Sequence, residues 1–113
     1  MNYFDKKIIW VTGASSGIGR EIAIQLSKYD CTLILTARRK EQLEDTKQKC
    51  GNANVQIFPF DLSKIDEIDN FSLRVQKEVG EIDILINNAG VSAWSGVEAV
   101  SYTHLTLPTT PYV

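Results

Sequence analysis

The chain has 113 residues, of which 43% are hydrophobic and 23% are charged, and its formal net charge is −2. This length predicts one domain or part of one, and the composition is that of an ordinary globular protein. The slightly negative charge argues against a nucleic-acid-binding protein, which would carry a basic surface.

The N-terminus leads directly into an apolar stretch and shows no signal-peptide pattern. No apolar run approaches the length that spans a bilayer, so we expect a cytoplasmic protein without a membrane partner. The two cysteines, Cys31 and Cys50, form no CxxC pair and have no histidine nearby. We expect them to be reduced packing residues and expect no metal site.

Short apolar stretches rich in β-branched residues alternate with longer amphipathic ones. The apolar stretches predict strands at residues 7–12, 32–36, 54–58 and 82–86. Helices are predicted from the glycine-rich turn to about residue 28, where Ile18, Ile22, Leu26 and Tyr29 recur at helical spacing, and over residues 39–50. A third helix begins after a Ser63 cap and ends at Gly80, with Ile65, Ile68, Phe71, Val75 and Val79 on its buried face.

Strands that alternate with helices in this way predict an α/β fold. The connections are expected to be right-handed crossovers between parallel strands. We therefore predict a Rossmann-type doubly wound parallel sheet, with strand order 3-2-1-4 and helices on both faces in three layers.

The last part of the chain has a different character. Residues 99–113 are threonine-rich and have neither helical nor strand periodicity, and the stretch VSYTHLTLPTT matches an in-frame translation of a transposon-end sequencing adapter. We interpret residues 99–113 as a non-native, adapter-derived tail, with a genuine β-rich tail as the alternative, and exclude them from fold interpretation. His104 and Tyr102 lie in this tail and are not used as catalytic candidates.

The stretch Thr12-Gly-Ala-Ser-Ser-Gly-Ile-Gly19 lies between a predicted strand and a predicted helix, the context that a dinucleotide-binding turn requires. Gly13 allows a sharp turn, Gly17 a close approach to a diphosphate, and Gly19 tight packing of the helix. The start of the helix offers free N–H groups to phosphate oxygens. We assign Gly13, Ser15, Ser16, Gly17, Ile18 and Gly19 to the site.

The end of the second predicted strand indicates which dinucleotide is bound. NAD sites usually carry an acidic residue there, which bonds the ribose 2′-hydroxyl. This chain has Arg38 and Arg39 and no acid. Charge-assisted bonds from arginine to phosphate contribute about 1.5–3 kcal/mol each, enough for roughly a ten- to hundredfold preference for NADP over NAD. The alternative is two solvated arginines at a helix start.

Two more turns complete the predicted site. Asp61 and Leu62 follow the third strand, where the carboxylate can accept a bond from an adenine amino group; the alternative is a polar turn before the Ser63 cap. The fourth strand is followed by Asn87, Asn88, Ala89 and Gly90. In the predicted strand order this turn faces the glycine-rich turn across the cofactor. Asn87 is expected to tie it to neighbouring backbone, and an ordinary Asn-Gly turn is the alternative.

Together these residues resemble the classical short-chain dehydrogenase/reductase family. Its TGxxxGxG signature matches residues 12–19, its NNAG element matches residues 87–90, and its acidic adenine contact matches Asp61. Arg38 stands at the position that NADP-preferring members use for the 2′-phosphate. The resemblance implies that residues 1–98 are the N-terminal part of an NAD(P)-binding Rossmann domain.

The resemblance also implies hydride transfer between a nicotinamide and a small carbonyl or alcohol substrate in a full-length parent, and family members are often homo-oligomers. Family members use a serine and a Tyr-x-x-x-Lys motif for catalysis. Here Tyr102 is followed by Thr106 at that spacing, and no lysine occurs after Lys77. We therefore assign no catalytic residue and expect this fragment to bind the dinucleotide at most. A non-catalytic dinucleotide-binding module is the alternative, and an S-adenosylmethionine site is a weaker one.

Overall fold

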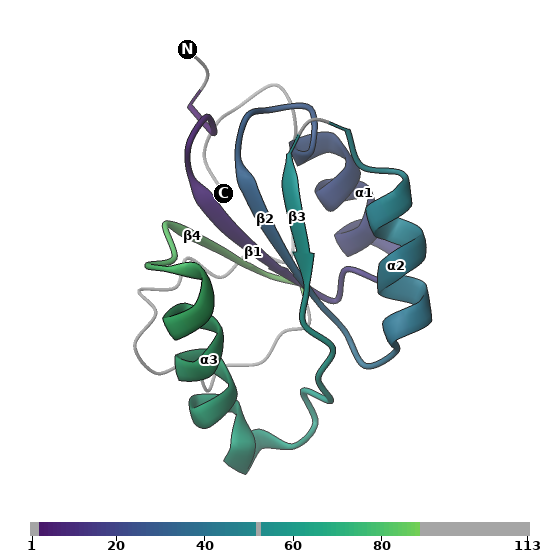
Figure 1. Ribbon diagram of the computed structural model, residues 1–113. Helices are drawn as coiled ribbons and strands as arrows, with labels where there is room; N and C mark the ends of the chain where they lie inside the picture. Colours follow the sequence, from purple (N-terminus) through teal and green to yellow (C-terminus); the bar gives the residue numbers. More distant parts are fainter. Residues whose placement is uncertain (1–2, 52, 89–113) are drawn as a thin grey trace.

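The fold is described here from a computed structural model, which covers residues 3–51 and 53–88 (Figure 1). The predictions for Ala89, Gly90 and residues 99–113 lie outside these described residues. Strands and helices alternate as predicted. They are β1 (Ile8–Thr12), α1 (Gly17–Leu26), β2 (Thr32–Thr36), α2 (Lys40–Gln48), β3 (Asn54–Ile57), α3 (Ile65–Val79) and β4 (Ile84–Asn87).

The strands form one parallel sheet with the order β3-β2-β1-β4, which confirms the predicted topology. β1 lies between β2 and β4, and its last residue, Thr12, is in register with Thr36 on one side and Asn87 on the other. Because parallel strands end at the same edge of a sheet, the residues that follow them are brought together there.

Helices cover both faces of the sheet, with α1 and α2 on one side and α3 on the other (Figure 1). Side chains of a strand alternate between the two faces. In β1, Ile9 and Val11 therefore join the core under α1 and α2, whereas Trp10 joins the core under α3. There the Trp10 ring meets the edge of Phe71, with 5.8 Å between ring centroids.

The start of α3 differs from the prediction. Ser63 does not cap the helix: the N-cap residue is Lys64, which makes no side-chain capping bond, and Ser63 bonds back to Asp61 instead. Ile65, predicted to be buried, is 59% exposed. A serine oxygen that caps a helix accepts from a backbone N–H, whereas here the Ser63 hydroxyl donates to Asp61, and a hydrogen bond to a charged carboxylate is the stronger of the two.

The strand β4 spans Ile84–Asn87, so it begins and ends later than the predicted residues 82–86. The backbone N–H of Ile8 donates to Asp83 Oδ2 at 2.8 Å, and the Asp83 N–H donates to the Ile8 carbonyl at 2.9 Å. After these two hydrogen bonds, regular pairing with β1 runs from Ile84 to Asn87. Asn87 is thereby a strand residue, directly beside Thr12.

Both cysteines are free, Cys31 buried and Cys50 half-buried, in the core under α1 and α2. Burial, together with the nearby carboxylates of Asp5 and Asp30, raises the pKa of the Cys31 thiol to about 11. Both thiols pack as predicted. No helix within residues 3–51 and 53–88 is both long and apolar enough to cross a membrane.

Candidate functional site

The turn between β1 and α1 has the backbone that its glycines predict. Gly13 has φ 65° and Gly17 has φ 59°, in the left-handed region that glycine adopts at little cost. At Gly19 space is the constraint, because an added Cβ would lie 2.1 Å from the carbonyl oxygen of Gly13. The close packing predicted for Gly19 is thus present, although its partner is the turn itself and not the sheet.

The first turn of α1 presents an open, uncapped helix start. Ser16 is the N-cap residue, with extended backbone and no side-chain capping bond, and the first turn holds no acidic residue. No atom lies within 4 Å of the position that a Cβ of Gly17 would take. Since the first N–H groups of a helix lack partners within the helix, they are available here to an anion. Around them Ser15 is half-buried, and Ser16 and Ile18 are exposed.

The turn after β4 faces this turn, as predicted. Thr12 Oγ1 donates to Asn87 Oδ1 at 3.2 Å, and Asn88 Nδ2 donates to the carbonyl of Gly13 at 3.4 Å. Asn88 thus ties this turn to the backbone of the glycine-rich turn. Asn87 bonds the hydroxyl of Thr12, which lies directly beside it in the sheet. Ala89 and Gly90 lie beyond the described residues.

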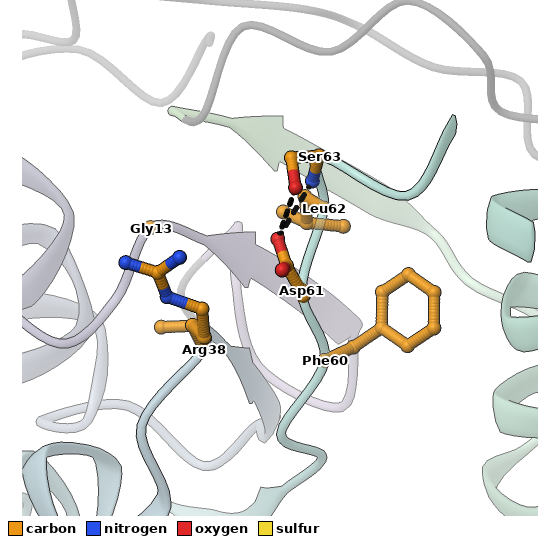
Figure 2. Close-up of a pocket in the computed structure, with 7 residues that line it drawn as sticks. Gly13, Arg38, Phe60, Asp61, Leu62 and Ser63 are labelled. Atoms are coloured by element: carbon orange, nitrogen blue, oxygen red, sulfur yellow. Dashed lines mark hydrogen bonds between the residues drawn. The ribbon is translucent and has the colours of Figure 1, made fainter.

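A pocket of about 220 Å³ opens beside this turn, at the ends of β1, β2 and β3 (Figure 2). It is lined by Gly13, Ala37, Arg38, Phe60, Asp61, Leu62 and Ser63. The pocket thus brings together four residues predicted from separate turns, namely Gly13, Arg38, Asp61 and Leu62. Arg39 does not line it, and is the exposed N-cap residue of α2.

The Arg38 guanidinium reaches across the mouth of the pocket toward Gly13 (Figure 2). Ala37 precedes it and is buried, so the β2 end carries no acidic side chain into the pocket. Within the described residues no ion pair of 4 Å or less engages Arg38, whose charge therefore remains available to a ligand.

Asp61 is held in the pocket by its neighbour Ser63. Oδ1 of Asp61 accepts the Ser63 hydroxyl at 2.6 Å and the Ser63 backbone N–H at 3.0 Å (Figure 2). These two bonds lower the pKa of Asp61, the hydroxyl more than the N–H, and the charges of Arg38 and Lys64 lower it further. The carboxylate stays ionised well into the acid range and can accept a hydrogen bond from a ligand.

The sequence did not predict the residues of β2 and α2 that hold the glycine-rich turn in place. The Ala14 N–H donates to the Thr36 carbonyl at 3.3 Å, and Thr46 Oγ1 donates to the Ala14 carbonyl at 3.0 Å. Trp10 Nε1 donates to Thr36 Oγ1 at 2.8 Å. The only signal in the sequence was a threonine at a core-facing position of a polar helix, which does not reveal its partner 32 residues away.

Comparison with known proteins identifies this arrangement. The sequence model described as short chain dehydrogenase matches residues 7–106. The chain belongs to the short-chain dehydrogenase family. Members of this family are oxidoreductases that bind NAD(P) and act on small molecules.

Relatives of this short-chain dehydrogenase chain include a mouse protein, dehydrogenase/reductase SDR family member 7, which is 45% identical over 91 residues. The alignment covers 75% of this chain and 27% of the mouse protein. An uncharacterized oxidoreductase of Staphylococcus saprophyticus is 42% identical over 98 residues, covering 87% of this chain and 40% of that protein. The chain thus spans well under half the length of these relatives.

Among solved structures, L-sorbose reductase from Gluconobacter frateurii, crystallised with NADPH and L-sorbose, superposes with a TM-score of 0.66. The two chains are 32% identical, and the superposition covers 78% of this chain and 35% of the reductase. The four-stranded sheet and its helices are therefore those of a short-chain dehydrogenase.

Proposed function

We propose that this chain is the dinucleotide-binding part of an NADP-dependent oxidoreductase. Its full-length form transfers hydride between NADP(H) and a carbonyl or alcohol substrate. The observation that carries the proposal is the end of β2, where the residues that enter the pocket are Ala37 and Arg38 and neither is acidic. A carboxylate there would repel a 2′-phosphate, whereas a guanidinium binds one with paired hydrogen bonds.

Each part of the edge has a role in this proposal. The open start of α1 and the backbone of Gly13 and Gly17 receive the diphosphate, together with Ser15, Ser16, Ile18 and Gly19. Arg38, assisted by Arg39, takes the 2′-phosphate. Asp61 and Leu62 contact the adenine, and the turn of residues 87–90 borders the ribose and nicotinamide. When bound, NADPH supplies the hydride.

Two observations support the choice of NADP. The charge of Arg38 is not neutralised by an ion pair among the described residues, so a phosphate does not have to displace a carboxylate. In addition, the structurally similar L-sorbose reductase was crystallised with NADPH. The groups that move protons are proposed to come from a part of the protein outside residues 1–98.

Calorimetric titration of the complete protein tests the proposal. We expect NADPH to bind about ten- to a hundredfold more tightly than NADH, because only NADPH carries the 2′-phosphate. Adenosine 2′-monophosphate should compete with NADPH, and adenosine 5′-monophosphate serves as its matched control. Equal affinities for NADPH and NADH would overturn the NADP assignment. Displacement of NADPH by S-adenosylmethionine would overturn the oxidoreductase function.

A further inference from the structure

Thr46 is a buried polar residue in a helix that is otherwise mostly solvent-facing. Only Leu43 and Thr46 of α2 are buried, and Thr46 is 0% exposed. Its hydroxyl lies 3.0 Å from the Ala14 carbonyl and 3.3 Å from the Gln42 carbonyl one helical turn earlier. The hydroxyl has one hydrogen, and the shorter contact is the one that leaves the helix. The Thr46 side chain therefore connects α2 to the glycine-rich turn.

The Ala14 carbonyl that Thr46 holds belongs to the same rigid peptide unit as the Ser15 N–H. A trans peptide unit is planar, and its C=O and N–H point in opposite directions. Fixing the Ala14 carbonyl on α2 therefore directs the Ser15 N–H away from α2. No acceptor for this N–H occurs among the described residues.

The preceding peptide unit is fixed in the same manner from other elements. The Ala14 N–H donates to the Thr36 carbonyl of β2, and the Gly13 carbonyl accepts from Asn88. Both peptide units that flank Ala14 are thus held, and within residues 3–51 and 53–88 the bond that fixes the second unit comes from Thr46. In the absence of the Thr46 hydroxyl, the buried Ala14 carbonyl would lose this partner.

Helix α2 is itself anchored beside this bond. The neighbouring residue, Asp45, forms an ion pair of 2.8 Å with Arg20, which directly follows Gly19 in α1. At its other end α2 begins immediately after Arg38 and Arg39. One helix therefore contacts the glycine-rich turn and also continues directly from the arginines of the proposed 2′-phosphate site.

On the basis of the proposed function, we infer that Thr46 is a positioning residue for the cofactor diphosphate: it orients the turn at Ala14 without contacting the cofactor. The expected signature is a loss of affinity for every ligand that carries the dinucleotide diphosphate. Adenosine 2′-monophosphate, which lacks that diphosphate and needs only the pocket at Arg38 and Asp61, should be unaffected.

The test compares two substitutions in the complete protein. Thr46→Val keeps the shape of the side chain and removes the hydroxyl, whereas Thr46→Ser keeps the hydroxyl. We expect Thr46→Val to weaken NADPH and NADH by the same factor, about tenfold, as the loss of one buried hydrogen bond predicts. Binding of adenosine 2′-monophosphate should change by less than about twofold, and Thr46→Ser should restore NADPH affinity to within about threefold.

Asp45→Asn is the matched control, because it removes the neighbouring ion pair while leaving the Thr46 hydroxyl in place, and it should leave NADPH affinity within about twofold. The inference is overturned if Thr46→Val binds NADPH normally. It is also overturned if adenosine 2′-monophosphate is weakened as much as NADPH, since Thr46 then serves the fold as a whole.

If Thr46→Val does not fold, Thr46→Ala takes its place, and failure of both to fold overturns the inference. Failure of the proposed function gives a different result. A wild-type protein that binds NADH as tightly as NADPH removes the NADP assignment, while the equal effect of Thr46→Val on both dinucleotides persists. A wild-type protein that binds neither dinucleotide overturns both.

Discussion

The two halves of the proposed nucleotide-binding site, the glycine-rich turn and the pocket beside it, are held by different kinds of contact. The glycine-rich turn is fixed by bonds from residues distant in the sequence, with Asn88 and Thr46 contacting backbone atoms of Gly13 and Ala14. The pocket beside it has an exposed Arg38, and its Asp61 is held by Ser63, only two residues away. The first region is set by the packing of the whole sheet, and the second by a local turn.

This difference separates two properties of the site. Substitutions in the glycine-rich turn should disturb the fold together with the affinity for any dinucleotide, because the same contacts serve both. Substitutions around the pocket should change which dinucleotide is preferred and leave the fold intact. Substitutions at Gly19, Arg38 and Ser63 test whether fold stability and dinucleotide preference are separable in this way.

The largest effect is expected from Gly19→Ala. Its Cβ would lie 2.1 Å from a backbone oxygen, which cannot move without shifting β1 or α1. We expect a loss of about 3 kcal/mol in the free energy of unfolding, measured by urea denaturation, and no detectable dinucleotide binding. Gly17→Ala is the matched control, since its Cβ meets no atom within 4 Å and only the positive φ opposes it, at about 1 kcal/mol. Equal losses in both variants would show that Gly19 is not limited by space.

An intermediate effect, confined to affinity, is expected from Arg38→Ala. NADPH should bind about ten- to a hundredfold more weakly and NADH almost unchanged, because only the 2′-phosphate loses its partner. The free energy of unfolding should stay within about 0.5 kcal/mol of wild type, since the side chain is exposed. Arg39→Ala should cost less, because Arg39 does not line the pocket. A parallel loss of NADH affinity would contradict the separation between turn and pocket.

The smallest effect is expected from Ser63→Ala, in the pH dependence of binding. The Ser63 hydroxyl is the main cause of the lowered pKa of Asp61, so its removal should raise that pKa toward the ordinary value of 3.8. Asp61 accepts a hydrogen bond from the adenine amino group only as a carboxylate, so its contribution to NADPH binding is lost as pH falls through its pKa. In Ser63→Ala, NADPH affinity should therefore begin to fall at a higher pH than in wild type. Titrations in the acid range, with an NMR titration of the Asp61 carboxyl, measure this; coincident curves would exclude the role of Ser63.

The sequence predicted the local features of the fold well. The β-branched stretches and the helical spacing revealed every element, and the order of motifs along the chain indicated which turns would meet at one edge. These signals lie within a few residues of one another. Gly19 is an example, since the need for a small side chain was predicted from its place in the motif, whereas its contact with Gly13 was not.

Contacts made through space were the part that could not be predicted. Ser63 was expected to accept a hydrogen bond from the first turn of α3, but its hydroxyl donates to the Asp61 carboxylate. The backbone contact of Asn88 with Gly13 and the side-chain contact of Asn87 with Thr12 depend on how β4 pairs with β1, which no local pattern shows. Thr46 had no local pattern that would identify Ala14 as its partner.

The contact between Thr12 and Asn87 has a consequence for the order in which the parts of the sheet form. The two residues are 75 positions apart, because β4 pairs with β1. The pairs β1–β2 and β2–β3 instead join strands that are separated by a single helix. Closing the longer loop costs more chain entropy, and contacts between distant residues slow folding. During synthesis the glycine-rich turn leaves the ribosome early, but the neighbouring turn after β4 is made later, so the two turns can pack together only after β4 has been synthesised. Dinucleotide binding by a nascent chain would therefore indicate that β4 has already paired with β1.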